Sequence, residues 1–278
     1  MLRSTALDRM ALSYAAPEDG RLKQLAILAV ERATGRRRAE HIYHTVRRRL
    51  GPDTTVWSEA VRGLDLRVDY DQGRLEAVPR SGPLVVVANH PFGVVDGLIL
   101  CHLVSLVRED FKGVAMSTLC RVPEVREFVL PINFAETAEA AVVSARSRRR
   151  ARALLQEGGC LIIFPGGAVS TAQTPLGPAV DHDWHPFVGR LVMNSRATVL
   201  PVHFEGQNSR LFQLVSRFSA TLRLGMLVRE TLNHTGRTIR VRVGKARSFE
   251  DLPPSDDPAT MVAELRRLTD AVGREQLA

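Results

Sequence analysis

The segment Val85-Val86-Val87-Ala88-Asn89-His90-Pro91-Phe92-Gly93-Val94-Val95-Asp96-Gly97 joins an unbroken apolar run to a short turn that carries polar residues. The run before the turn, Pro83 to Ala88, is rich in β-branched residues and predicts a strand that is buried on both faces. The run after it, Val94 to Val107, is apolar on nearly every side and predicts a buried helix. We therefore expect His90 where a strand passes into a helix. In an open α/β sheet this carboxyl end of the strands is the usual place for a ligand.

The rest of the chain continues this alternation of strand and helix patterns, which favours an α/β fold with a mainly parallel central sheet flanked by helices. The expected strands cover residues 64–70, 84–88, 113–116, 160–164 and 198–204, with residues 238–243 as an added edge strand. The expected helices cover residues 94–107, 123–129, 136–157 and 186–195, and Asp257 with Pro258 marks the start of a closing helix. A length of 278 residues is enough for one large domain with a substantial core.

His90 and Asp96 are the two side chains of the opening segment that suggest chemistry. Histidine titrates near neutral pH, and a carboxylate on its far ring nitrogen fixes the tautomer, so such a pair can take a proton from a hydroxyl group. A core histidine and aspartate that only satisfy each other's hydrogen bonds are the alternative interpretation. The Asn, Pro and Gly residues around the pair favour the catalytic one.

These residues resemble the glycerolipid acyltransferase superfamily, the lysophosphatidic-acid-acyltransferase-like enzymes, whose first motif is Asn-His, a short spacer and Asp. Three later segments resemble the family's second, third and fourth motifs, in the family's order: Leu130–Phe134, Ile163–Ser170 and Val199–Val202. The segment Phe204–Ser209 is similar to the bacterial hemolysin-related branch.

The resemblance implies transfer of a fatty acyl group from a thioester, either acyl-CoA or acyl-carrier protein, to a hydroxyl group of a lysolipid. In this scheme His90 is the general base, Asp96 orients it, and no further cofactor is needed. The backbone amides of Gly166 and Gly167 are candidate donors to the oxyanion, with an ordinary strand-to-loop turn as the alternative. The substrate-binding residues implied by the resemblance are Asn89, Gly93, Arg121, Asn133, Pro165, Gly166, Gly167 and Ser170.

The sequence departs from the family pattern at two places. Five residues rather than the common four separate His90 from Asp96, and Gly93 can absorb the extra residue by taking a positive φ. The family's usual Phe-Pro-Glu-Gly is Phe-Pro-Gly-Gly here, with Gly166 in place of a glutamate associated with acceptor binding. A non-catalytic lipid-binding or regulatory protein on the same scaffold is therefore the alternative function.

Positive charge is concentrated in the first 50 residues, which carry +6 of the chain's net charge of +8. We therefore expect an N-terminal basic helical segment over residues 1–60 and an α/β acyltransferase domain with a C-terminal helix over 61–278. Arginine triplets at 36–38 and 47–49 flank an apolar helical stripe, a pattern typical of helices that contact anionic membranes. Packing of this stripe on the domain is the alternative. Nucleic acid is not expected as a partner, because the arginine triplets contain no interleaved aromatic residues and no nucleic-acid-binding motif accompanies them.

Other functional classes lack their signatures in this sequence. There is no Gly-x-Ser-x-Gly elbow, no phosphate-binding glycine loop and no metal-binding histidine motif, so no metal is expected. The three cysteines have no CxxC spacing and are expected to be reduced. No apolar stretch is long enough for a transmembrane helix and no signal peptide is evident, which favours a cytoplasmic protein, peripheral on the inner face of the cell membrane. Arginine outnumbers lysine 35 to 3, which favours a bacterial source with a G+C-rich genome.

Two further segments each have two possible roles. The region Thr171–Trp184 is expected to be a long loop that borders the acceptor pocket or touches lipid, with Trp184 as an interfacial anchor or, alternatively, a core residue. The arginines at 146, 148, 149, 150 and 152 spread over several faces of one helix, so a solvated helix end is favoured over phosphate binding.

Overall fold

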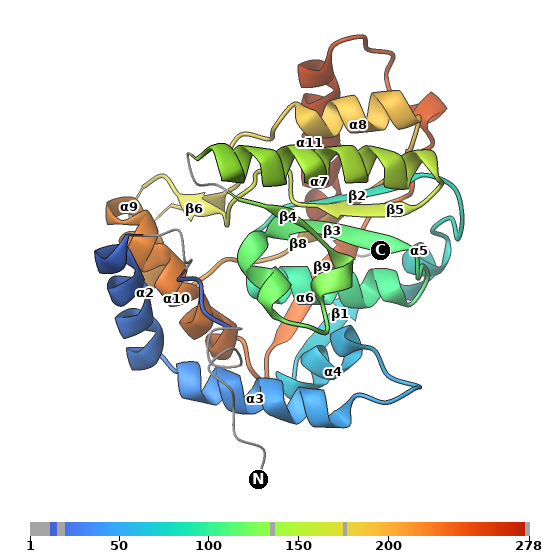
Figure 1. Ribbon diagram of the computed structural model, residues 1–278. Coiled ribbons are helices and arrows are strands. Elements are labelled where there is room, and N and C mark those ends of the chain that lie inside the picture. The colour runs from blue at the N-terminus through green and yellow to red at the C-terminus, as the bar shows by residue number, and fades with distance from the viewer. Residues whose placement is uncertain (1–11, 16–19, 134–136, 175–176, 276–278) are drawn as a thin grey trace.

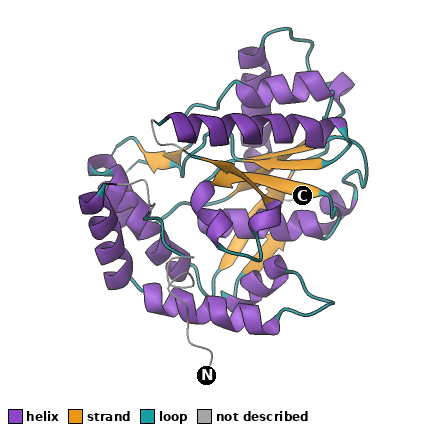
Figure 2. Cartoon of the chain, in the orientation of Figure 1, coloured by secondary structure: helices purple, strands orange, loops and turns teal. Residues whose placement is uncertain are grey.

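The computed structural model describes residues 12–15, 20–133, 137–174 and 177–275, and in them seven strands form one sheet (Figures 1 and 2). Their spatial order is β1 (Arg67–Tyr70), β9 (Thr238–Val243), β8 (Thr198–Phe204), β2 (Leu84–Ala88), β5 (Cys160–Ile163), β3 (Phe111–Met116) and β4 (Val129–Ile132). The five strands from β8 to β4 are parallel, whereas β9 and β1 run in the opposite direction. The expected α/β class with a mainly parallel sheet is confirmed.

Strand β2 lies in the middle of the sheet and all five of its residues are buried, as its apolar run predicts. It pairs with β5 on one side and with β8 on the other, so that Val86 lies between Ile162 and Leu200. Because these strands are parallel, their carboxyl ends meet at one edge of the sheet. The turn that follows β2 is therefore at this edge, where the third and fourth motifs also end.

Helices cover both faces of the sheet (Figure 1). One face packs against α7 (Ala138–Gln156), α8 (Phe187–Ser195) and α11 (Pro258–Arg274) in a core that includes Val85 and Val87 of β2. The other face packs against α4 (Val56–Gly63), α5 (Gln72–Glu76) and α6 (Val94–Ser105) in a core that includes Val86 and Ala88. Alternate residues of one strand thus supply two separate cores.

Four helices form a separate layer beside the sheet: α2 (Arg21–Ala33), α3 (Arg36–Arg49), α9 (Arg210–Phe218) and α10 (Ala220–Asn233). Helix α10 packs against the other three. The apolar side of α3 packs on α4, where Val46 is buried and leaves no room for a Cβ atom on Gly63. The packing alternative therefore holds for this helix. Five of its six arginines are exposed, whereas Arg36 is half-buried and pairs with Glu31 (3.2 Å). The expected domain boundary after residue 60 falls inside α4, and Trp57 and Val61 of α4 belong to one core.

The structure corrects two of the expected elements. Residues 238–243 form a strand, but β1 covers its outer side, so it is not at the edge. The alternation of polar and apolar residues along this strand shows that one of its faces is exposed, and an internal strand can also have an exposed face. Residues 123–129 do not form a helix: they contain the short 3₁₀ turn η2 (Arg126–Phe128), after η1 (Ser117–Arg121), and lead into β4. Short apolar runs are compatible with either state, and pairing with β3 decides this one.

The structure also shows the exposure of the α7 arginines and the state of the three cysteines. The five arginines of α7 are exposed, as expected for a solvated helix end. The three cysteines are free, and burial raises the pKa of Cys101 and Cys160 to about 12. Among the described residues, no helix combines the length and apolar character needed to cross a bilayer.

Candidate active site

His90 lies at the carboxyl edge of the sheet, two residues beyond the end of β2, as the sequence predicts. Its Nδ1 atom is 3.0 Å from Oδ1 of Asp96, whose side chain is fully buried in the first turn of α6. The His90 side chain is 18% exposed and stacks on the ring of Phe164, with the ring centroids 4.1 Å apart. The imidazole is thus held at one nitrogen and on one face, while part of it stays accessible.

The turn between His90 and Asp96 is held by the same carboxylate. Oδ2 of Asp96 accepts hydrogen bonds from the backbone N–H groups of Phe92 (2.9 Å) and Gly93 (3.2 Å). Gly93 has φ 86° and ψ −100°, a conformation that is nearly restricted to glycine. A Cβ atom there would also lie only 3.0 Å from Val169 and 3.1 Å from Leu227. The expected positive φ at Gly93 is confirmed, and it accommodates the five-residue spacer.

Burial of the imidazole lowers the pKa of His90, but the carboxylates of Asp96 and Asp181 together raise it more, so its pKa is above the ordinary value. A histidine of this kind is a stronger base toward a hydroxyl group. It is also protonated, and inactive as a base, over more of the acidic range.

Asp181 is a second carboxylate at the site, and the sequence analysis missed it. Its Oδ1 accepts the backbone N–H of His90 (3.1 Å) and the hydroxyl of Ser170, and its Oδ2 accepts the indole N–H of Trp184 (3.0 Å). The backbone N–H of Ser170 in turn donates to the carbonyl oxygen of His90 (2.8 Å). Asp181 therefore ties the turn between His90 and Asp96 to the third motif. The sequence signal that could have identified Asp181 is its position in a polar loop, three residues before Trp184.

The third motif forms the turn after β5. The N–H of Gly167 donates to the carbonyl oxygen of Phe164 (3.0 Å), which leaves Gly166 as the remaining candidate oxyanion donor of the pair. A Cβ atom on Gly166 would lie 3.3 Å from the carbonyl oxygen of His182 and 3.5 Å from Cβ of Asp181. The segment 181–182 thus crowds the position at which the family pattern has glutamate, and Asp181 brings a carboxylate there from another part of the chain.

Three of the predicted substrate-binding residues have hydrogen-bonding or buried roles in the fold. The Asn89 side chain donates to the carbonyl oxygen of Phe204 (3.0 Å) and accepts its N–H (2.7 Å), which joins the ends of β2 and β8. Pro165 and Ser170 are buried, and the Pro165 carbonyl oxygen accepts the N–H of His185 (3.1 Å). Contact of these residues with substrate stays a prediction.

Arg121 follows β3, which is two strands from β2, or about 10 Å at the usual strand spacing. Its guanidinium donates to the carbonyl oxygens of Ser13 (3.2 Å) and Ala15 (2.8 Å). The buried Glu31 holds the same N-terminal segment through the Ser13 hydroxyl (2.9 Å) and the Tyr14 N–H (2.8 Å). Arg121 therefore binds the chain's own backbone, and its contact with a substrate stays a prediction.

Asn133 lies at the end of β4, three strands from β2. Its backbone N–H and carbonyl oxygen bond the Ser144 hydroxyl at 3.3 and 3.2 Å. Phe134, the last residue of the second motif, lies outside the described residues. The second motif thus shares an edge with His90 but is not beside it.

Trp184 is 6% exposed and packs in the core against the helices of the α7, α8 and α11 face. Its indole N–H already donates to Asp181. Because the rest of the ring is packed in the core, Trp184 gains nothing from a position at a membrane interface. The prediction that it anchors the protein in lipid is wrong, and the core alternative is right. The described part of residues 171–184 contains the short hairpin of β6 (Thr171–Ala172) and β7 (Ala179–Val180).

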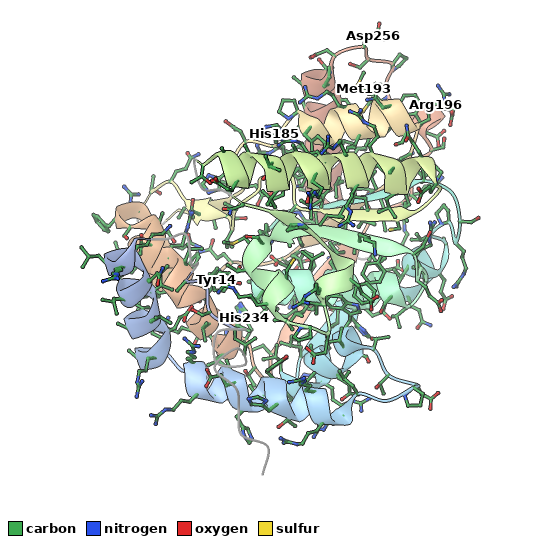
Figure 3. The ribbon with its side chains drawn as sticks, viewed as in Figure 1. Tyr14, His185, Met193, Arg196, His234 and Asp256 are labelled. Atoms are coloured by element: carbon green, nitrogen blue, oxygen red, sulfur yellow. The ribbon has the colours of Figure 1, made fainter. Side chains whose placement is uncertain are left out.

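Apolar side chains fill the space between the His90–Asp96 turn and α10. Phe92 packs edge-on against His234, with 4.5 Å between the ring centroids, and burial lowers the pKa of His234. Tyr14 packs against the cluster that contains Val169 and Leu227. Figure 3 shows Tyr14 and His234 on the α10 side of the molecule.

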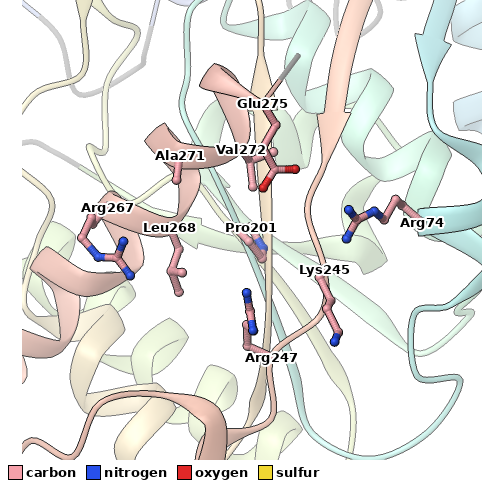
Figure 4. Close-up of a pocket in the computed structure, with 9 residues that line it drawn as sticks. All are labelled: Arg74, Pro201, Lys245, Arg247, Arg267, Leu268, Ala271, Val272 and Glu275. Atoms are coloured by element: carbon pink, nitrogen blue, oxygen red, sulfur yellow. The ribbon is translucent and has the colours of Figure 1, made fainter. Parts of the chain in front are cut away.

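A cavity of about 330 Å³ lies elsewhere, between α11 and the segment that follows β9 (Figure 4). None of the predicted site residues lines it. Its charged lining residues are Arg74, Lys245, Arg247, Arg267 and Glu275. Within the described part of the chain, no group of three His, Cys, Asp or Glu side chains is arranged to hold a metal ion.

Comparison with known proteins identifies the family to which this chain belongs. A family model described as an acyltransferase matches residues 22–269. The lyso-glycine lipid O-acyltransferases of Phocaeicola vulgatus and Bacteroides thetaiotaomicron are 24% identical over 206 residues and 25% identical over 203 residues. These matches cover 70% of this chain and 70% and 71% of the two relatives. The crystal structure of the 1-acyl-sn-glycerophosphate acyltransferase PlsC from Thermotoga maritima matches with a TM-score of 0.49 and 16% identity, over 80% of this chain and 78% of that one. Because the family model spans most of its length, this chain belongs to the acyltransferase family.

Proposed function

We propose that this chain transfers a fatty acyl group from an acyl thioester to a hydroxyl group of a lysolipid. The observation that supports this most is the accessible imidazole of His90, 3.0 Å from the buried carboxylate of Asp96. In the proposed reaction, Nε2 of His90 takes the hydroxyl proton while Asp96 accepts Nδ1–H and stabilises the imidazolium. The alkoxide attacks the thioester carbonyl carbon, the C–S bond breaks, and the thiolate leaves with the proton from the imidazolium.

A lysolipid acceptor is supported by the printed names of the two relatives, both lyso-glycine lipid O-acyltransferases. We propose that lysolipids with an amino-acid headgroup are the first acceptors to test. Asp181 and its neighbours occupy the place of the family's glutamate, so the headgroup preference is expected to differ from that of enzymes with this glutamate.

The proposed donor is acyl-CoA or acyl-carrier protein, with no further cofactor. A general-base mechanism needs only a donor with a good leaving group, and a thiolate is one. The N–H of Gly166 is the proposed contact to the oxyanion of the tetrahedral intermediate. The proposed place of action is the inner face of the cell membrane, at an anionic lipid surface, where an intracellular thioester and a membrane lipid can meet.

The test is release of free thiol from acyl-CoA or acyl-carrier protein with a panel of lysolipids, followed by identification of the acylated product. His90→Gln is expected to lower kcat/KM by about 10²–10⁴-fold, the usual size of a general-base contribution. His102→Gln, on the same side of the sheet but remote from the turn, is the matched control and is expected to stay active. Absence of product with every donor and acceptor, while the folded protein still binds lipid, would overturn the proposal.

A further inference from the structure

A continuous group of exposed apolar side chains lies on the helical layer beside the sheet. Phe218 is 80% exposed and Leu22 is 84% exposed, which is unusual for side chains of this size. We call this group the apolar face. It consists of Leu22, Leu25, Leu211, Leu214, Phe218 and Leu222.

Helix α9 presents its apolar residues in two opposite directions. Phe212 is completely buried against the domain, whereas Leu211, Leu214 and Phe218 are exposed at i, i+3 and i+7. This spacing places the three side chains on one stripe of the helix. A stripe that faced only water would normally be polar, so the outer side of α9 has the character of a contact surface.

The exposed leucines of α2 lie at the same level as this stripe. Helices α2 and α10 pack in parallel, because Gly225 of α10 lies against Val30 and Ile27 of α2, whereas Leu232, later in α10, lies against Gly35, which follows α2. Extending this register back to the start of α2 brings its exposed leucines level with the end of α9 and the start of α10. Figure 1 shows α2, α9 and α10 side by side at one side of the molecule.

The charge in the described helical segments that carry the apolar face is all of one sign. Residues 20–30 and 209–228 contain no Asp or Glu. Their basic residues are Arg21, Lys23, Arg210, Arg217 and Arg223. Apolar side chains surrounded by cations complement a surface that is apolar within and negative at its boundary, and an anionic lipid bilayer has this structure.

The inner side of these helices reaches the turn from His90 to Asp96, which we call the catalytic turn. Phe212 of α9 and Leu227 of α10 pack in one cluster with Val169 of the third motif. Val169 and Leu227 are the side chains that enclose Gly93, between His90 and Asp96. The apolar face and the catalytic turn are thus opposite sides of the same thin layer.

We infer that the apolar face docks this enzyme on anionic lipid bilayers and holds the catalytic turn one helical layer from the membrane surface. The inference rests on the proposed function for its biological purpose, but the binding can be measured without turnover. It assigns the contact to α2, α9 and α10, and not to the basic helix α3, whose apolar side is packed inside the protein.

The test is binding of the full-length protein to phosphatidylcholine vesicles with and without phosphatidylglycerol. Leu214→Gln/Phe218→Gln is expected to weaken binding to the mixed vesicles by at least about tenfold, since each side chain loses apolar area buried in the membrane. Val142→Gln removes an exposed apolar side chain on the remote helix α7 and serves as the matched control. Equal binding by the double variant and the control would overturn the inference.

The charged rim has a separate test. Arg21→Gln/Arg210→Gln is expected to weaken binding about fivefold per residue, only when phosphatidylglycerol is present and only at low salt. Loss of binding to pure phosphatidylcholine of the same size would contradict the electrostatic part.

Two more measurements separate this inference from its alternatives. With a short-chain lysolipid that stays monomeric in solution, Leu214→Gln/Phe218→Gln is expected to turn over like the wild type, whereas turnover of a vesicle-embedded acceptor falls. If the wild type binds vesicles through this face but acylates nothing, the proposed function fails and the docking face stands. If the double variant instead changes a dimer into a monomer without any change in vesicle binding, the face joins two copies of this chain and the inference is wrong.

Discussion

Replacement of Asp96 by asparagine is expected to abolish the basicity of His90 while the fold survives, and the hydrogen bonds of Asp96 explain why. Oδ2 accepts two buried backbone N–H groups, and Oδ1 faces Nδ1 of His90. An asparagine must direct its single oxygen to one of these two sides. Facing its NH₂ toward the two backbone donors would leave both without an acceptor, at about 1–3 kcal/mol each.

The side-chain oxygen of the introduced asparagine is therefore expected to stay on the backbone side, which turns its NH₂ group toward Nδ1 of His90. Nδ1 must then carry the lone pair, so the proton moves to Nε2, the nitrogen that should receive the substrate proton. Gly97, whose N–H lies 2.9 Å from Oδ1 of Asp96, keeps the Gly93 carbonyl oxygen as a second acceptor, so the cost to the fold is small. The expected loss of kcat/KM is about 10⁴-fold, as for a base held in the wrong tautomer, or about 5–6 kcal/mol in the barrier.

The assay combines three measurements on Asp96→Asn: thiol release with the best acceptor, the thermal midpoint, and the ¹⁵N chemical shifts of the His90 ring. We expect little activity, a nearly unchanged midpoint and an Nε2–H tautomer. Asp96→Ala is the contrasting variant, since it orphans both backbone donors and should lower the free energy of unfolding by about 2–6 kcal/mol. Activity of Asp96→Asn within tenfold of the wild type would refute the tautomer argument.

Two further predictions concern the same turn. Asp181→Asn removes one of the charges that raise the pKa of His90, so the acidic limb of the kcat/KM profile is expected to move to lower pH. Trp184→Phe is the control, because it removes one hydrogen bond of Asp181 but keeps its charge, and it should leave that limb in place. An acidic limb that moves equally in both variants would contradict an electrostatic role of Asp181. Gly93→Ala is expected to lower the free energy of unfolding by about 2–5 kcal/mol, because of backbone strain at φ 86° and two tight contacts of the new methyl group. Gly97→Ala is the control, since no atom lies within 4 Å of its Cβ position, and it should be neutral or slightly stabilising in denaturant titrations.

The central part of the fold was predictable because its signals are local. The unbroken apolar run of β2 and the all-round apolar helix α6 each require burial on every side, and only the middle of a layered α/β domain provides it. His90 and Asp96 follow from the same segment, since a strand-to-helix turn brings residues six apart into contact. The glycine that makes this turn possible was also evident from its position in the spacer.

Other features depend on contacts between distant segments and left little trace in the local sequence. Strand β4 exists because it pairs with β3, and β9 is internal because β1 covers it. Asp181 reaches His90 across 91 residues of chain, and its role comes from three donors that meet only in the folded protein. The apolar side of α3 could have faced lipid or the domain, and the position of α4 decided between them.

The sequence by itself determined the α/β class, the central strand and helix, and the pairing of an imidazole with a carboxylate at their junction. Hydrophobic periodicity and short-range geometry are sufficient for these features, because they involve neighbouring residues. Only the tertiary structure decided the strand order at the edges, the second carboxylate at the base and the side of the molecule that exposes apolar residues. Each of these depends on which distant surfaces become buried against one another, and a residue's own neighbours in the chain do not report that.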